Sequence, residues 1–155
     1  MTAQLDLEGP LPQGRLVIEA SAGTGKTYSL SALVARHVAE RKLAASSLLI
    51  VTFTKAAAAE LRDRTRRVLV SAVESLSTGV IPADQGWMVT LAHPDSNEQG
   101  ARLKALEAAV ASFDDATITT IHGFCQQALR QLGFRSGTPL EGELVLEQVQ
   151  TIEIG

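Results

Sequence analysis

A glycine-rich stretch, "EASAGTGKTYSL" (residues 19–30), has the residue types and spacing of a phosphate-binding loop. It matches G-x-x-x-x-G-K-[ST] except that Ala20 takes the place of the first glycine. In such loops, backbone N–H groups and the N-terminus of the following helix point at phosphate oxygens. Lys26 would bridge the β- and γ-phosphates of a nucleotide, and the Thr27 hydroxyl would bind Mg²⁺. The alternative is a chance glycine turn that only caps a helix.

Three short runs predict the strands that must position this loop. They comprise residues 15–20, residues 47–53 and the β-branched start of residues 116–132. The first two are continuous apolar runs bounded by turn-forming or polar residues, which is typical of buried strands. Because helical patterns alternate with these runs, the sequence predicts an α/β fold with a parallel sheet flanked by helices. Three strands are few for a doubly wound sheet.

Helical periodicity follows each strand. The apolar face of the first helix comprises Leu30, Leu33, Val34 and Val38, with Arg36, Glu40 and Arg41 elsewhere. Residues 55–76 predict a long alanine-rich helix with two i,i+4 ion pairs, Glu60–Arg64 and Asp63–Arg67. Residues 77–100 are rich in turn formers and predict a loop, and residues 101–112 predict a shorter helix. The last helix is expected to begin near His122.

The bulk composition excludes several classes of protein. With 155 residues, 45% hydrophobic and 20% charged, the chain has the composition of a globular domain. Its net charge of −3 argues against a protein that holds nucleic acid by overall basicity. One cysteine, Cys125, allows no internal disulfide. We find no leader peptide at the N-terminus and no membrane-length apolar run, so we expect a cytoplasmic protein.

Two later segments place the loop in a known family. They are "VTFTKAAAAEL" (residues 51–61) and "TITTIHGFCQQAL" (residues 117–129). Taken in order after "EASAGTGKT", they resemble motifs I, Ia and the following DNA-contacting motif of UvrD/Rep-like superfamily 1 helicases. The resemblance is closer still to RecB-like beta subunits of exodeoxyribonuclease V, and it covers about residues 6–133. This family accepts alanine at the position of Ala20.

The resemblance implies a partial RecA-like P-loop domain that binds ATP and Mg²⁺. Residues 1–135 would be the first part of helicase domain 1A, and residues 136–155 the start of a 1B-type insertion or a tail. Lys26 and Thr27 would be catalytic, with Thr27 also the Mg²⁺ ligand. The phosphate-binding residues would be Ala20, Ser21, Ala22, Gly23, Thr24, Gly25, Lys26 and Thr27.

Two further residues would hold the base. By resemblance, Gln13 would read the adenine edge, because an amide can accept from N6–H and donate to N7. A polar turn residue before the strand is an equal alternative for Gln13. Tyr28 lies where a ring could pack beside the base, although the pattern favours a partly buried helix tyrosine.

Six residues would contact single-stranded DNA in proteins of this family: Thr52, Phe53, Thr54, Thr120, His122 and Phe124. Hydroxyls and backbone N–H groups would hold phosphates, and the ring of Phe53 would stack on a base. From its pattern alone, Phe53 would more often be a core residue. A lone histidine such as His122 is also more often structural than functional.

The resemblance implies part of an ATP-dependent, 3′→5′ DNA helicase that acts in recombinational double-strand-break repair. Its partners would be single-stranded DNA, the remainder of the helicase chain and other exodeoxyribonuclease V subunits. The acidic pair that should complete the Mg²⁺ site is not evident, because Asp114 and Asp115 precede a strand and fit a helix-to-strand connection. The isolated chain is therefore expected to be catalytically incomplete. The alternatives are a small stand-alone P-loop ATPase or kinase, and a non-catalytic truncated interaction module.

Overall fold

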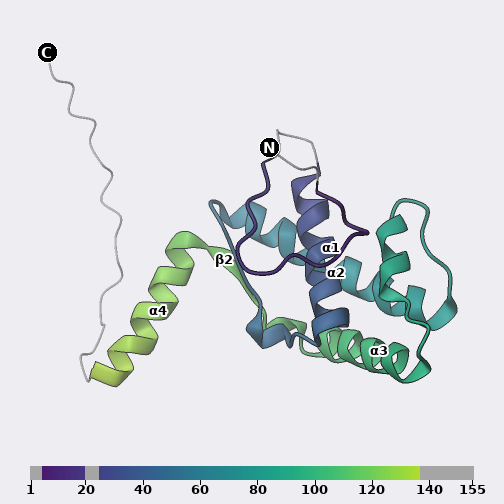
Figure 1. Ribbon diagram of the computed structural model, residues 1–155. Helices are drawn as coiled ribbons and strands as arrows, with labels where there is room; N and C mark the ends of the chain where they lie inside the picture. The colour runs from purple at the N-terminus through teal and green to yellow at the C-terminus, as the bar shows by residue number, and fades with distance from the viewer. Residues whose placement is uncertain (1–4, 20–24, 137–155) are drawn as a thin grey trace, which may run out of the picture. The chain divides into compact units, whose positions relative to one another are not determined.

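The computed structural model describes residues 5–19 and 25–136, and in this part of the chain helices predominate (Figure 1). The elements in order are α1 (Lys26–Arg41), η1 (Ala45–Ser47), β1 (Leu49–Thr52), α2 (Lys55–Thr78), η2 (Gly86–Leu91), α3 (Ser96–Ala111), η3 (Phe113–Asp115), β2 (Thr117–Thr120) and α4 (Ile121–Ser136). The chain divides into two compact units, Met1–Ile121 and His122–Gly155. Among the described residues, no helix is both long and apolar enough to cross a membrane.

A two-stranded parallel sheet lies within the first unit. β1 pairs with β2 in a register that joins Leu49 to Thr117 at one end and Thr52 to Thr120 at the other. The inner face of β1 is buried at Ile50, whereas Leu49 is 50% exposed on the outer face. The predicted α/β class with a parallel sheet is confirmed. The strand predicted within residues 47–53 is observed as β1, but the expectation that it is buried is wrong for one face, since Leu49 and Val51 are exposed in the described structure.

The apolar run at residues 15–20 does not form the predicted strand. Residues 15–19 have no regular structure, and Val17 is 83% exposed, with Leu16 and Ile18 also exposed. Ala20 lies outside the described residues. A strand needs a neighbour to satisfy its N–H and C=O groups. In the described part of the chain the sheet consists of β1 and β2 alone, so this run has no ladder to join.

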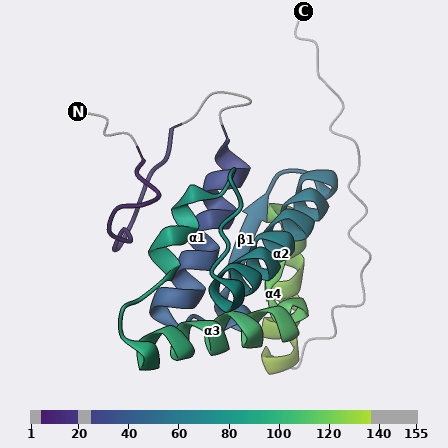
Figure 2. The same ribbon diagram turned by 90° about the vertical axis from the view of Figure 1, so that its right-hand side faces the viewer.

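The three long helices of the first unit pack against one another (Figure 2), and α2 also packs against both strands of the sheet. The largest fully buried side chains include Leu69 from α2, Leu106 from α3 and Phe113 from η3. Hydrophobic burial of this kind is the main favourable term in folding. The core therefore lies between the helices and the sheet, and it fixes where α1 and the carboxyl ends of the strands lie.

Capping residues set where two of these helices begin. The hydroxyl of Thr54 accepts a hydrogen bond from Ala57 N at 3.1 Å, and α2 ends at Gly79 with φ +74°. The predicted helix at residues 55–76 is confirmed and runs two residues further. α3 begins at Ser96, earlier than the predicted residue 101, because the Asp95 carboxylate accepts from the first N–H groups of the helix.

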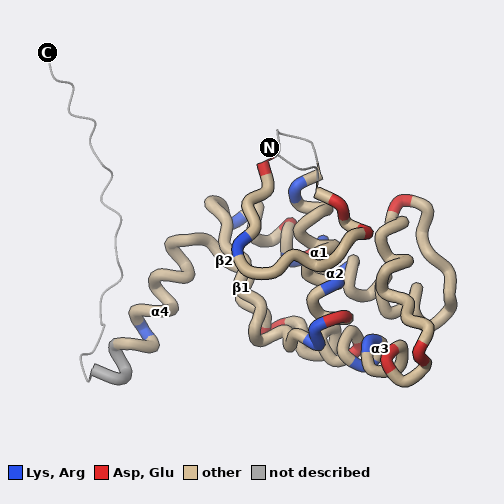
Figure 3. Tube along the Cα trace, viewed as in Figure 1, with Lys and Arg blue, Asp and Glu red and all other residues tan. Residues whose placement is uncertain are grey.

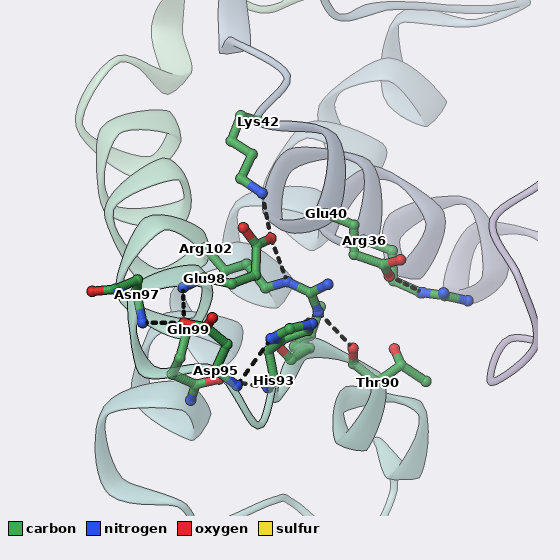
Figure 4. Close-up of polar contacts among 11 residues, drawn as sticks. Arg36, Glu40, Lys42, Thr90, His93, Asp95, Asn97, Glu98, Gln99 and Arg102 are labelled. Carbon is green, nitrogen blue, oxygen red and sulfur yellow. Dashed lines mark hydrogen bonds and ion pairs between the residues drawn. The ribbon is translucent and has the colours of Figure 1, made fainter.

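A polar network joins the end of α1 to the beginning of α3 (Figure 4). Arg102 donates to the Glu98 carboxylate at 3.1 Å and to the carbonyl oxygens of Thr90 and Leu91 at 3.0 and 3.2 Å. Lys42, the residue that caps the end of α1, also donates to Glu98. The hydrogen bonds from Lys42 and then from Arg102 lower the pKa of Glu98 below its ordinary value of 4.5.

This network predicts a pH dependence of stability that Glu98→Gln removes. A carboxyl with a lowered pKa in the folded state contributes stability above its ordinary pKa and loses it as the pH falls through the lowered value. We expect the wild-type urea midpoint to fall below pH 4.5, the ordinary pKa, more steeply than that of Glu98→Gln. Glu107→Gln, at an exposed position of the same helix, is the control. Identical pH profiles for wild type and Glu98→Gln would contradict the role of the network.

Candidate nucleotide and DNA site

The N-terminus of α1 has the geometry of an anion site. Gly25 is its N-cap with φ +86°, a left-handed conformation that glycine adopts without strain, and this residue makes no side-chain capping hydrogen bond. The first turn holds no acidic residue, and it begins with the exposed Lys26. The first N–H groups of a helix have no partner within the helix and carry its positive dipole. This end of α1 therefore suits a negatively charged ligand.

The other two long helices of this unit begin differently. α2 is capped by the Thr54 hydroxyl and α3 by the Asp95 carboxylate. Side-chain caps satisfy N-terminal donors that an external anion would otherwise take. Among the N-cap residues of α1, α2 and α3, which the structure describes, Gly25 is the one that has no side chain to make such a bond.

Part of the predicted loop lies outside the described residues. This part comprises Ala20, Ser21, Ala22, Gly23 and Thr24. Gly25 and Lys26 are placed at the start of α1, and Thr27 follows half-buried. The predicted contacts of the loop with phosphate remain a prediction.

The described residues contain no cluster of three or more histidine, cysteine, aspartate or glutamate side chains suited to a metal ion. The hydroxyl of Thr27 fits the single Mg²⁺ ligand that was predicted, since Mg²⁺ binds oxygen and keeps several waters. Asp114 and Asp115 lie in η3, immediately before β2. They are therefore at the amino end of the strand, whereas ligands of parallel sheets bind beyond the carboxyl ends. The prediction that these acids belong to a helix-to-strand connection is confirmed.

Tyr28 is the partly buried helix tyrosine that its pattern favours. Its hydroxyl donates to the carbonyl oxygen of Asp84 at 2.8 Å, and burial raises its pKa above the ordinary value. The contact joins the first turn of α1 to the segment before η2. A role for the ring beside a base stays a prediction.

Gln13 lies in an irregular segment next to a turn. Its neighbour Gly14 has φ +73°, and Leu11, two residues earlier, is buried at 8% exposure. The side chain of Gln13 is exposed. Both interpretations, a turn residue and a reader of adenine, are compatible with this position.

The two predicted DNA-contacting segments meet at the carboxyl edge of the sheet. Thr52, the last residue of β1, is the register partner of Thr120, the last residue of β2. Phe53 follows Thr52 and is 88% exposed. The pattern-based interpretation of Phe53 as a core residue is therefore wrong, because the chain leaves the sheet before it. The structure therefore brings the hydroxyl-bearing residues Thr52 and Thr120 and the exposed Phe53 to the carboxyl edge of the sheet.

The remaining DNA-contact candidates are placed differently. Thr54 uses its hydroxyl oxygen to cap α2, a local role that the sequence analysis missed although a threonine directly before a helical run is a known signal. His122 and Phe124 belong to the second unit, in the first turn of α4, where both are exposed.

Basic and acidic residues are interspersed along the described part of the trace (Figure 3). Arg66 lies 3.7 Å from Asp114, and Arg64 lies 3.5 Å from Glu60, as predicted. The predicted Asp63–Arg67 ion pair is wrong, since Arg67 donates to the backbone carbonyl of Asp63. Nucleic acid would therefore be held by a local group of contacts and not by a broad positive field.

One buried residue was missed by the sequence analysis. Arg36, which the helical pattern put off the apolar face, is only 3% exposed. It forms an ion pair with Glu40 and donates to two backbone carbonyls of the N-terminal segment. The only sign of this ion pair in the sequence was the i,i+4 spacing of Arg36 and Glu40. That spacing does not distinguish a buried ion pair from an exposed one.

Comparisons with known proteins agree with these motifs. A family described as "UvrD/REP helicase N-terminal domain" matches residues 3–153. The chain is 39% identical over 143 residues to the RecBCD enzyme subunit RecB of Mycobacterium tuberculosis, covering 91% of this chain and 13% of that protein. It is 42% identical over 132 residues to RecB of Mycolicibacterium smegmatis, and 37% over 147 residues to RecB of Escherichia coli. These alignments cover 83% and 88% of this chain, and 12% of each relative.

The capping contact predicts that Thr54→Ala destabilises the fold whether or not DNA is present. Loss of an N-cap hydroxyl costs about 1 kcal/mol of unfolding free energy, and Thr54→Ser should keep most of it. Urea unfolding followed by circular dichroism measures both variants. If Thr54→Ala is as stable as wild type, the hydroxyl is not needed as a cap and is available to a phosphate.

Proposed function

Because this chain belongs to the UvrD/REP helicase N-terminal domain family, we propose that it binds ATP and contacts single-stranded DNA as part of an ATP-dependent DNA helicase. The observation that carries the proposal is the N-terminus of α1, where Gly25 is the N-cap in a left-handed conformation and Lys26 is the first helical residue. It lies where the sequence motif puts the triphosphate. The experiment that tests it is a nucleotide titration, described below.

The proposed nucleotide site uses residues at both ends of the ligand. The ammonium group of Lys26 and the amides at the start of α1 would hold the β- and γ-phosphates. When bound, Mg²⁺ would neutralise phosphate charge, with Thr27 as its protein ligand. At the other end, the amide of Gln13 would accept from the adenine N6–H and donate to N7.

The proposed DNA contact lies at the carboxyl edge of the sheet. Thr52 and Thr120 are register partners there, and Phe53 is exposed beside them. Threonine hydroxyls and backbone N–H groups can bind phosphates, and a phenyl ring can stack on any base. By the family resemblance, His122 and Phe124, which belong to the second unit, would also contact DNA. Such a contact favours single strands, whose bases are free to stack.

We propose that this chain binds nucleotide without completing its hydrolysis. Thr27 would supply one Mg²⁺ ligand, and the described acids Asp114 and Asp115 lie at the amino end of β2. Rapid phosphoryl transfer also needs a positioned water and compensation of the developing charge. These groups would come from further segments of a helicase, for which residues 1–135 would form the first part of domain 1A and residues 136–155 the start of a 1B-type insertion.

The relatives suggest the assembly in which this part works. They are named as RecB subunits of a RecBCD enzyme, and this chain spans 12–13% of their length. By that similarity we propose that the partners are DNA and the other subunits of an exodeoxyribonuclease V-like enzyme. Translocation would run 3′→5′, in the repair of double-strand breaks by recombination.

Lys26→Ala should weaken ATP binding by about 1.5–3 kcal/mol, the contribution of hydrogen bonds to a charged group. Titration of a fluorescent ATP analogue with Mg²⁺ measures this loss. Lys55→Ala is the matched control, because Lys55 is the first residue of α2 just as Lys26 is the first residue of α1. Equal affinities of wild type and Lys26→Ala would contradict the phosphate site.

Phe53→Ala should reduce affinity for single-stranded DNA by about 1–3 kcal/mol, the usual contribution of one stacked base. Phe53→Leu keeps an apolar side chain without an aromatic face and should lose most of the same affinity. Val80→Ala, at another exposed apolar position, should bind as wild type does. Fluorescence anisotropy at several salt concentrations measures these effects, since phosphate contacts weaken as salt rises. If duplex DNA binds as well as single strands, Phe53 does not act by stacking.

A further inference from the structure

The N-terminal strap, residues 5–14, is fixed to α1 by a buried guanidinium. Arg36 donates from one terminal nitrogen to the carbonyl oxygens of Leu7 at 2.9 Å and Gly9 at 2.7 Å. These residues are 29 and 27 positions away in the sequence. The side chain of Arg36 is only 4% exposed. Figure 1 shows the strap running across α1.

The charge of this guanidinium is compensated within the same helix. Its Nε donates to the Glu40 carboxylate at 2.6 Å, and that side chain is 18% exposed. A buried charge is tolerated only when it is paired and its donors are satisfied. The planar fork of arginine lets one side chain reach a carboxylate and two carbonyls together, which the single ammonium of lysine cannot reproduce. Arg36 is thus suited to hold a backbone segment in one position.

Gln13 follows directly from the fixed part of the strap. Leu11 is buried at 8% exposure, and Gly14 turns the chain with φ +73°. Before them, the Asp6 carboxylate accepts from Glu8 N at 2.8 Å and shapes the bend that Arg36 holds. Gln13 therefore projects from a short segment anchored by Arg36 and Leu11 on one side and directed by a turn on the other.

The same helix carries the phosphate end of the proposed site. α1 begins at Lys26, and Arg36 lies ten residues later, about 15 Å along the axis at 1.5 Å per residue. A helix in a packed core is rigid at this length. The strap is therefore bound to the same rigid helix, α1, whose N-terminus would hold the phosphates.

We infer that Arg36 is a positioning residue that sets the base selectivity of the nucleotide site through Gln13. The inference rests on the proposed nucleotide-binding function. With the strap held, the amide of Gln13 is already placed to meet N6–H and N7 of adenine. Guanine presents an acceptor, O6, where adenine presents a donor, so a fixed amide rejects it. Without the guanidinium, Gln13 must be ordered on binding, and the amide is free to turn to suit either base.

The chain contains a matched control for Arg36. Arg102 also donates to a glutamate four residues away, Glu98, and to two backbone carbonyls, those of Thr90 and Leu91 (Figure 4). Its side chain is 11% exposed. It holds the end of η2 and not the strap, so Arg102→Met removes a similar contact that does not lead to Gln13.

The test compares the affinities of ATP, GTP and inorganic triphosphate for the full 155-residue chain. Arg36→Met should lower the ATP-to-GTP affinity ratio about tenfold, the effect of losing one charge-assisted hydrogen-bonded contact, while the affinity for triphosphate stays unchanged. Arg102→Met should leave the ratio as in wild type. Arg36→Lys keeps the charge without the fork and should also lower the ratio, so it serves if the methionine variant does not fold.

A cycle with Gln13→Ala separates positioning from a merely structural role. If Arg36 acts through Gln13, Arg36→Met should not change the ratio further in the Gln13→Ala background. An unchanged ratio in Arg36→Met and Arg36→Lys, or an equal fall in Arg102→Met, would overturn the inference while the nucleotide site stands. A wild-type chain that binds ATP and GTP equally would overturn the role of Gln13 and the inference, while the phosphate site stands. A wild-type chain that binds none of the three ligands would overturn the proposed site itself.

Discussion

The parallel pairing of β1 with β2 is the constraint on which the rest of the first unit depends. Parallel strands cannot be joined by a tight turn, so the chain between them must cross over the sheet. Here α2, η2 and α3 make that crossover. The register places Thr52 opposite Thr120, and so the ends of both strands lie at one edge. A shift of one residue would turn Ile50 and Ile118 out of the core, which fixes the register through burial.

Within the described part of the first unit, helices cover one face of the sheet, and this explains several features that otherwise look unrelated. Helices bury Ile50 and Ile118, while Leu49 and Val51 on the other face are 50% and 39% exposed. The apolar run before the glycine loop is exposed for a related reason, because no described strand pairs with it. Local apolar character is therefore not sufficient for burial; a facing surface is also required.

α1 joins the two parts of the proposed nucleotide site. Its N-cap is the left-handed Gly25, which makes no side-chain capping hydrogen bond, and this suits an anion. Ten residues later, Arg36 fixes the strap that carries Gln13. The core against which α1 packs, with Val38 fully buried, holds both features in one rigid element. The carboxyl edge of the sheet, with the exposed Phe53, belongs to the same packed unit.

The sequence by itself determined the features that depend on neighbours within a few residues. Periodicity predicted the apolar face of α1 and the bounds of α2 nearly to its ends, and the order of apolar runs and helices predicted the α/β class. Motif spacing located the glycine loop and the segments after it. Even so, the start of α3 was missed although Asp95 and Glu98 form a recognisable capping pattern.

Only the tertiary structure decided which side chains are buried and which distant residues meet. Arg36 is buried because residues 27 and 29 positions away lie across it, and Thr52 meets Thr120 because a crossover brings distant strands together. Phe53 is exposed because the chain leaves the sheet there. These outcomes depend on contacts between residues far apart in the chain, which periodicity does not encode.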